Sequence, residues 1–345
     1  MRRCTRVGIE VTKRCNWRCQ TCFHRWKPTF NADEHRTIES VATEIDAAIA
    51  RGCDHSVLVG EGEPTLWRGL FEFIQYCKDK GITSSVITNG TCSIEKAARM
   101  YETGLNHLHV SAHGMGETLD RIAGVPGAGI KQSALIEWLG ESGLPWRSNA
   151  TLQLENYKEL PKITDYMITN GCRHIVYLGF LPHYEWNDPE KLRTVAVHPA
   201  ELRPYLEESI GIIEDTNSKK TRSIDDPQIL TTIRYHPMCH IEPRYWKYIV
   251  NARYVLYDPW EWDYEYLGLD DKSFWEAAKG IGGTVSVNGP PCIKCDLLLH
   301  CGGWNKHMVK GFNGAGLDAK LLMPKLTEPG AIHDQNPANH AKGYF

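Results

Sequence analysis

The segment Cys15-Asn16-Trp17-Arg18-Cys19-Gln20-Thr21-Cys22 carries three thiol side chains and follows the alternating apolar run Val7-Gly8-Ile9-Glu10-Val11. Such alternation predicts a β-strand, so the thiols lie in the first loop after a strand. Three thiolates in one loop can hold three corners of a [4Fe–4S] cluster and leave one iron open. A structural zinc site needs four ligands, and His24 is the candidate for the fourth.

Strand-like runs alternate with amphipathic stretches from this loop to about residue 185. Strands are expected at residues 7–11, 56–59, 85–87, 107–110, 149–152 and 174–178. Helices are expected at residues 38–49, 70–80, 94–101, 131–141 and 160–169. Parallel strands need helical crossovers, so six β/α units predict one parallel sheet. A closed barrel has eight units, and the predicted fold is therefore α/β, a partial (β/α)6 TIM-type barrel.

The composition excludes several classes of protein. With 42 % hydrophobic and 23 % charged residues, the chain is neither disordered nor fibrous. A formal net charge of −3 argues against nucleic acid as a partner. No apolar run is long enough to span a membrane, and the N-terminus lacks the apolar core of a signal peptide. The expected location is the cytoplasm, where cysteines serve metal binding or catalysis more often than disulfides.

Small and polar residues follow the next three strands. These segments are Gly60-Glu61-Gly62-Glu63-Pro64-Thr65, Thr88-Asn89-Gly90-Thr91 and Ser111-Ala112-His113-Gly114. In a β/α barrel the loops at the carboxyl ends of the strands build the active site. Glycines let a ligand approach the backbone, and carboxylates accept hydrogen bonds from an ammonium group. The pattern predicts one elongated ligand across the barrel mouth.

Residues 5–185 resemble the radical S-adenosylmethionine (SAM) superfamily. The resemblance rests on three motifs that follow one another in the chain: the C-x3-C-x2-C loop, Gly62-Glu63-Pro64 and the Thr-Asn-Gly turn. The resemblance implies a [4Fe–4S] cluster on Cys15, Cys19 and Cys22, with SAM on its open iron. Reductive cleavage of SAM would give a 5′-deoxyadenosyl radical that takes a hydrogen atom from the substrate.

The resemblance also implies the residues that contact SAM, with Gly62 and Glu63 at the methionyl amino group. The other implied contacts lie at successive strand ends: Pro64, Thr88, Asn89, Ser111, Asn149, Thr151 and Leu178. Two positions depart from the family pattern. Thr21 stands where an aromatic residue often precedes the third cysteine, and Glu61 stands where glycine is common.

A second cysteine cluster, Cys292-x2-Cys295-x5-Cys301-Gly-Gly, also has metal-binding spacing, and a zinc ribbon is one interpretation. Within this chain it resembles the auxiliary-cluster region of SPASM or twitch enzymes. No cysteine follows Cys301, so one auxiliary [4Fe–4S] cluster is expected, with Cys239 as the fourth ligand. If Cys239 is not a ligand, an open iron could bind substrate.

The predicted domains are therefore a barrel, a helical or linker segment, a small auxiliary-cluster domain and a C-terminal tail. Their expected bounds are residues 1–185, 186–238, 239–310 and 311–345. Candidates for acid, base or radical-relay roles lie near strand ends: His113, Cys92, His183 and Tyr184. A structural role is open for each.

The first functional hypothesis is a radical SAM oxidoreductase acting on a small polar molecule, with the auxiliary cluster as electron acceptor or substrate anchor. The alternative is a SPASM-type peptide-modifying maturase that makes thioether, carbon–carbon or epimerised products. Because the sequence starts at the first strand, a partner protein would have to supply a leader-binding domain. A zinc or iron–sulfur protein that binds nucleic acid is the remote alternative. The expected electron donor is a flavodoxin or ferredoxin.

Overall fold

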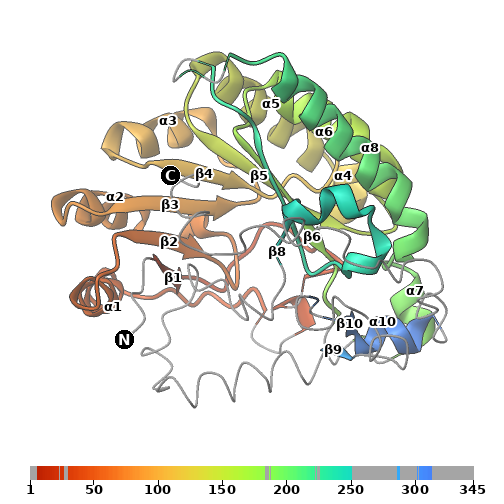
Figure 1. Ribbon diagram of the computed structural model, residues 1–345. Coiled ribbons are helices and arrows are strands. Elements are labelled where there is room, and N and C mark those ends of the chain that lie inside the picture. The colour runs from red at the N-terminus through yellow and green to blue at the C-terminus, as the bar shows by residue number, and fades with distance from the viewer. Residues whose placement is uncertain are drawn as a thin grey trace. The chain divides into compact units, whose positions relative to one another are not determined.

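Figure 1 shows the computed structural model, which describes residues 6–22, 24–26, 30–182, 186, 188–221, 223, 226–250, 286–287, 301 and 303–312. The chain divides into two units, the first reaching Ser148 and the second starting at Asn149. Strands alternate with helices in both, and the fold is a partial TIM-type α/β barrel, as the sequence predicts.

The strands of the first unit are parallel and follow chain order. They are β1 (Arg6–Glu10), β2 (His55–Val59), β3 (Thr83–Thr88), β4 (His107–Val110) and the start of β5 (Trp146–Leu152). The helices between them are η1 (His24–Trp26), α1 (Ile38–Ala50), η2 (Pro64–Leu66), α2 (Leu70–Asp79), α3 (Ile94–Thr103), α4 (Gly116–Ala123) and α5 (Ala128–Ser142). Side-chain caps fix helix starts, because Thr37 and Ser93 accept bonds from the backbone of α1 and α3.

The two faces of this sheet differ in polarity. Buried apolar side chains such as Ile9, Leu58 and Leu108 lie on one face, where apolar residues of the helices pack. Paired residues of parallel strands point to the same side, so the register places Arg6 beside His55 on the other face. His55 is bonded to hydroxyls of β3, and burial with nearby cations lowers its pKa well below the usual value. Its ring is therefore neutral at pH 7.

The second unit continues the alternation. It contains η3 (Tyr157–Glu159), α6 (Leu160–Thr169), β6 (His174–Gly179), α7 (Pro189–Arg193), α8 (Pro199–Ser218), β7 (Leu230–Arg234), η5 (Met238–His240), η6 (Pro243–Tyr248) and β8 (Ile249–Val250). The strands β6, β7 and β8 are parallel neighbours. Near the C-terminus, β9 (Ser286–Val287) pairs antiparallel with β10 (Trp304–Asn305), and α10 (Lys306–Gly311) follows.

Several described elements were not anticipated from the sequence. The six-strand count stops at residue 178, whereas β7 and β8 extend the parallel set beyond Pro182. Only Leu230 and Ile233 are apolar in β7, too few to reveal a strand by alternation. The short helix α4, which starts at Gly116 and ends before Gly124, is also not among the predicted helices. In the part of the chain that the structure describes, no helix is long and apolar enough to cross a membrane.

Candidate functional site

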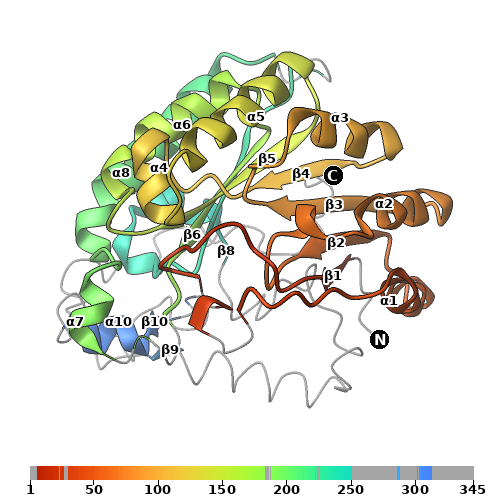
Figure 2. The same cartoon turned by 180° about the vertical axis from the view of Figure 1, so that it is seen from behind.

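The three N-terminal cysteines share the loop between β1 and η1, drawn in dark red in Figure 2. The backbone N–H of Cys15 donates to Asn31 Oδ1 at 3.0 Å, and the N–H of Arg18 donates to the Ala123 carbonyl of α4 at 2.7 Å. Trp17 is buried against α4 and α5, and Cys15 and Cys19 pack on the same apolar cluster. The unanticipated helix α4 therefore helps to hold the cysteine loop.

The donor chemistry of this loop fits an iron–sulfur cluster. The Trp17 N–H points at Cys15 Sγ from 3.4 Å, a contact that stabilises a thiolate. Burial, with smaller contributions from the nearby Glu63 and Cys22, raises the pKa of the Cys15 thiol to about 12. A metal must displace these protons to bind. Among the described residues, no three Cys, His, Asp or Glu side chains form a site for a single metal ion.

Glu63 is the buried centre of the second loop, 3 % exposed. Its Oε1 accepts bonds from the Thr65 N–H at 3.0 Å, the Thr65 hydroxyl at 2.7 Å and the Thr88 hydroxyl at 2.7 Å. Its Oε2 accepts from the Asn89 N–H at 2.7 Å. Burial raises the pKa of Glu63, and the donated bonds oppose that shift. Four donors thus fix one carboxylate across the loops after β2 and β3.

Asn89 joins these loops to the cysteine loop. Its Nδ2 donates to Asn16 Oδ1 at 2.6 Å, and Asn16 Nδ2 donates to the Thr91 hydroxyl at 2.9 Å. Gln132 of α5 donates to the Asn89 carbonyl at 2.7 Å and the Ser111 carbonyl at 3.1 Å. The structure therefore brings together the cysteine loop, Glu63, Thr88, Asn89 and Ser111. Asn16 and Gln132 were missed. Asn16 lies in the cysteine motif but is not one of the cysteines that define it, and Gln132 lies on α5 rather than in a loop after a strand.

Gly62 lies where the second loop touches the backbone of the cysteine loop. Its N–H donates to the Thr12 carbonyl, and a Cβ at this position would lie 2.1 Å from the Arg14 carbonyl oxygen. We expect Gly62→Ala to push the two loops apart, lowering the melting temperature and the iron content after reconstitution. Gly211→Ala is the matched control, because no atom lies within 4 Å of a Cβ in the middle of α8. This variant should gain about 0.5–1 kcal/mol of stability and keep its iron.

The candidates Cys92 and His113 are not ionised at neutral pH. Burial raises the pKa of the Cys92 thiol to about 12, and Glu63 adds to this shift. Burial lowers the pKa of His113 to about 4. Cys92 is therefore a thiol rather than a thiolate, and His113 is a neutral ring that follows β4. The third candidate, Tyr184, and His183 lie outside the described residues.

The two residues that depart from the family pattern, Glu61 and Thr21, have different surroundings. Glu61 Oε1 lies 3.5 Å from His24 Nδ1, so the acidic residue in place of glycine faces the histidine after the third cysteine. Thr21 occupies a half-buried turn position before Cys22. His24, the candidate fourth zinc ligand, thus has a carboxylate for its neighbour.

The remaining predicted SAM contacts lie in the second unit, on β5 and β6. Asn149 is 7 % exposed, and its Oδ1 has no hydrogen-bond partner among the described residues. Two strand alternations farther on, the buried Gln153 Nε2 also lacks a partner there. Buried polar atoms need partners, so this acceptor and donor suit a polar ligand. Sequence alternation through Thr151 could have identified Gln153, which was missed; Leu178 is half-buried on β6.

The second cysteine cluster is only partly described. Cys239 lies in η5, and Cys301 lies two residues before Gly303, whose N–H points at Cys301 Sγ from 3.4 Å. This contact repeats the one between Trp17 and Cys15. Cys292 and Cys295 lie outside the described residues, so the four-cysteine set stays a prediction.

A partial barrel with three cysteines in the loop after its first strand defines a class of cofactor-dependent enzymes. The family model described as the Radical SAM superfamily matches residues 9–167, which contain this loop and the Glu63 network. Residues 9–167 therefore match the Radical SAM superfamily, a family that uses a [4Fe–4S] cluster and SAM.

Several known proteins are similar to this chain. It is 28 % identical over 217 residues to a PqqA peptide cyclase of Methylobacterium nodulans, covering 62 % of this chain and 55 % of that protein. It is 31 % identical over 179 residues to an Fe-coproporphyrin III synthase of Methanosarcina barkeri, covering 50 % and 44 %. The chain thus spans about half the length of these curated relatives.

Solved structures show the same fold. SuiB of Streptococcus suis, solved with S-adenosylmethionine, superposes with a TM-score of 0.59 at 16 % identity, covering 88 % of this chain and 73 % of SuiB. SuiB has also been solved with its precursor peptide SuiA, at a TM-score of 0.52 and 17 % identity, covering 66 % and 48 %. A match at this identity supports the fold alone.

Proposed function

We propose that this radical SAM enzyme modifies a peptide substrate. The observation that supports this choice is the similarity to a peptide cyclase over 217 residues, 62 % of this chain. It favours the second hypothesis from the sequence over an oxidoreductase of small polar molecules. The similarity to an Fe-coproporphyrin III synthase keeps a small-molecule substrate as the competing outcome of the test.

In this proposal Cys15, Cys19 and Cys22 hold the cluster, which supplies the electron that cleaves SAM. Four hydrogen-bond donors hold the carboxylate of Glu63 in place. Its negative charge would attract the positively charged methionyl ammonium group of SAM. Asn16 and Asn89 keep the cysteine loop in register with the Glu63 loop. These hydrogen bonds would orient the cofactor.

Further residues complete the two proposed cofactor sites. Gly62, Pro64, Thr88 and Asn89 would surround the methionyl part of SAM, and Ser111 would contact its ribose or carboxylate. Asn149, Thr151 and Leu178 would contact the nucleoside, where the unpartnered Asn149 Oδ1 supports a polar contact. Cys239, Cys292, Cys295 and Cys301 would bind one auxiliary [4Fe–4S] cluster, and a flavodoxin or ferredoxin would supply electrons.

The test is turnover with a peptide. Reconstituted enzyme is incubated with SAM, a reductant and short peptides encoded beside its gene, and 5′-deoxyadenosine and peptide mass are measured. We expect 5′-deoxyadenosine to form together with a changed peptide mass. SAM cleavage that proceeds only with a tetrapyrrole or another small metabolite, leaving every peptide unchanged, would contradict the proposal.

A further inference from the structure

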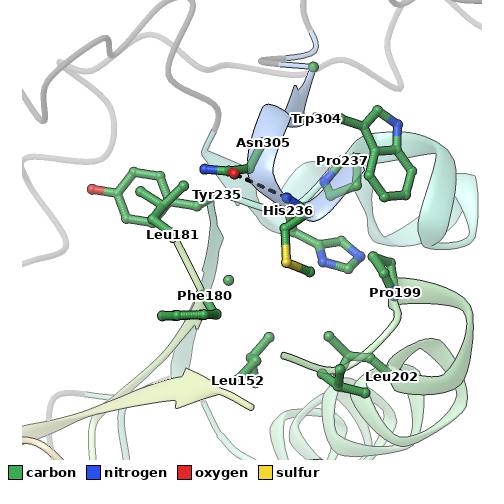
Figure 3. Close-up of a pocket in the computed structure, with 14 residues that line it drawn as sticks. Leu152, Phe180, Leu181, Pro199, Leu202, Tyr235, His236, Pro237, Trp304 and Asn305 are labelled. Carbon is green, nitrogen blue, oxygen red and sulfur yellow. Dashed lines mark hydrogen bonds between the residues drawn. The ribbon is translucent and has the colours of Figure 1, made fainter. Parts of the chain in front are cut away.

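The second unit contains a pocket at the carboxyl ends of its strands (Figure 3). Leu152 ends β5, Gly179 ends β6 and Tyr235 follows β7, so three successive strands meet there. Barrel enzymes bind ligands at this end of their strands. The cavity measures about 70 Å³ and opens to solvent, so it suits part of a ligand, such as one side chain, rather than a whole small molecule.

The walls of the pocket are mainly apolar and aromatic. Phe180, Leu181 and Trp304 line it together with Leu202 of α8 and Met308 of α10. Figure 3 shows Phe180, Leu152 and Leu202 around one hollow. Desolvating such walls favours an apolar group over a polar one.

The polar atoms in the lining are engaged within the protein. Asn305 Oδ1 accepts from the backbone N–H groups of His307 at 2.9 Å and Met308 at 3.3 Å. Asn305 Nδ2 donates to the Pro182 carbonyl at 3.1 Å. His236 Nε2 lies 3.3 Å from the His240 carbonyl, where it donates. A polar guest would find few groups to replace its bonds to water.

Tyr235, at the rim, has a strained backbone. Its φ is +58°, in the left-handed region that costs a residue with a side chain of order 1–3 kcal/mol. The residue is 41 % exposed, and the Arg234 guanidinium carbon lies 5.4 Å from the centroid of its ring. A Cβ on Gly179 would lie 2.3 Å from the Tyr235 carbonyl oxygen, so both strand ends are adapted to this geometry. Strain of this kind concentrates at ligand sites.

We propose that this pocket binds one large apolar side chain of the peptide substrate, with the Tyr235 ring closing over it. The inference rests on the proposed function, since it names the part of the peptide that the second unit recognises. Four rings line or flank the pocket, from Phe180, Tyr235, His236 and Trp304, and aromatic guests gain from edge-to-face contacts. The expected preference is phenylalanine over leucine, and leucine over serine.

The experiment measures binding of blocked amino acids to reconstituted holoenzyme by saturation-transfer NMR. The probes are the N-acetyl amides of phenylalanine, leucine and serine. Burial of an apolar side chain predicts a Kd about tenfold lower, or better, for the phenylalanine amide than for the serine amide. Leu181→Glu should remove this preference, whereas Leu154→Glu, on an exposed leucine of the same unit outside the pocket, should keep it.

Tyr235→Gly separates a structural role from a binding role. Glycine adopts the positive φ without strain, so the melting temperature should equal or exceed that of the wild type. The Kd for the phenylalanine amide should nevertheless rise several-fold. Equal affinity for all three amides, or unchanged affinity in Tyr235→Gly, would overturn the proposal. Selective binding of the phenylalanine amide without any peptide turnover would instead refute the proposed function and leave the pocket assignment standing.

Discussion

The variant Cys15→Ala/Cys19→Ala/Cys22→Ala is expected to lose about four irons per chain and all SAM cleavage. The wild type, with one auxiliary cluster, should hold about eight irons and the variant about four. The reason is that the three substituted cysteines are the proposed ligands of the SAM-binding cluster. The C-terminal cysteines, which would bind the auxiliary cluster, are unchanged in the variant. Iron and labile sulfide are measured after anaerobic reconstitution, and 5′-deoxyadenosine is quantified by chromatography.

Cys77→Ala is the matched control, since this buried thiol lies in α2, outside both cysteine clusters. It should keep its iron and its SAM cleavage while losing some stability from a small cavity. A fall from four irons to none in the triple variant would exclude the auxiliary cluster. Zinc without iron in both proteins would contradict the cofactor assignment itself.

Glu63→Gln is expected to weaken SAM binding at least tenfold and to destabilise the fold. An amide presents only one acceptor oxygen, so either the Asn89 N–H or the group of Thr65 and Thr88 donors faces an NH2 group. Leaving one buried donor unsatisfied costs about 1–3 kcal/mol. Loss of the negative charge also removes the attraction for an ammonium group. Thermal unfolding and equilibrium dialysis with SAM measure the two effects.

The control is Glu72→Gln, at an exposed position of α2, which removes the same charge without breaking a buried network. Its SAM affinity and melting temperature should match the wild type. If Glu63→Gln loses stability yet binds SAM with unchanged affinity at a temperature where it is folded, Glu63 has a structural role only.

Local sequence patterns were sufficient to predict a helix or strand whose own residues show the apolar periodicity. The apolar spacing of residues 38–49 predicts α1, and the alternation of residues 7–11 predicts β1. Strand-end motifs also identified Glu63, Thr88 and Asn89, which the structure joins by hydrogen bonds. The strand and helix predictions succeed because periodicity is a property of neighbouring residues, whereas the roles of Glu63, Thr88 and Asn89 stay predictions.

Contacts between distant segments could not be read in this way. Asn16 and Asn89 are joined across 73 positions, and Gln132 bonds to two strand-end carbonyls from the helix α5. Likewise, β7 has little alternation of its own, and its place is fixed by pairing with β6. Such features depend on which backbones lie side by side, which no local pattern records.

The sequence by itself determined the class of enzyme, because the spacing of Cys15, Cys19 and Cys22 fixes three thiols in one loop whatever surrounds them. Only the tertiary structure decided what holds that loop, through α4 and the Asn16–Asn89 bridge. It alone also revealed the pocket beside Tyr235, whose lining comes from three strand ends and two helices. The physical reason is that ligand spacing is local in the chain, whereas a cavity and a buried hydrogen-bond network exist only after distant segments pack together.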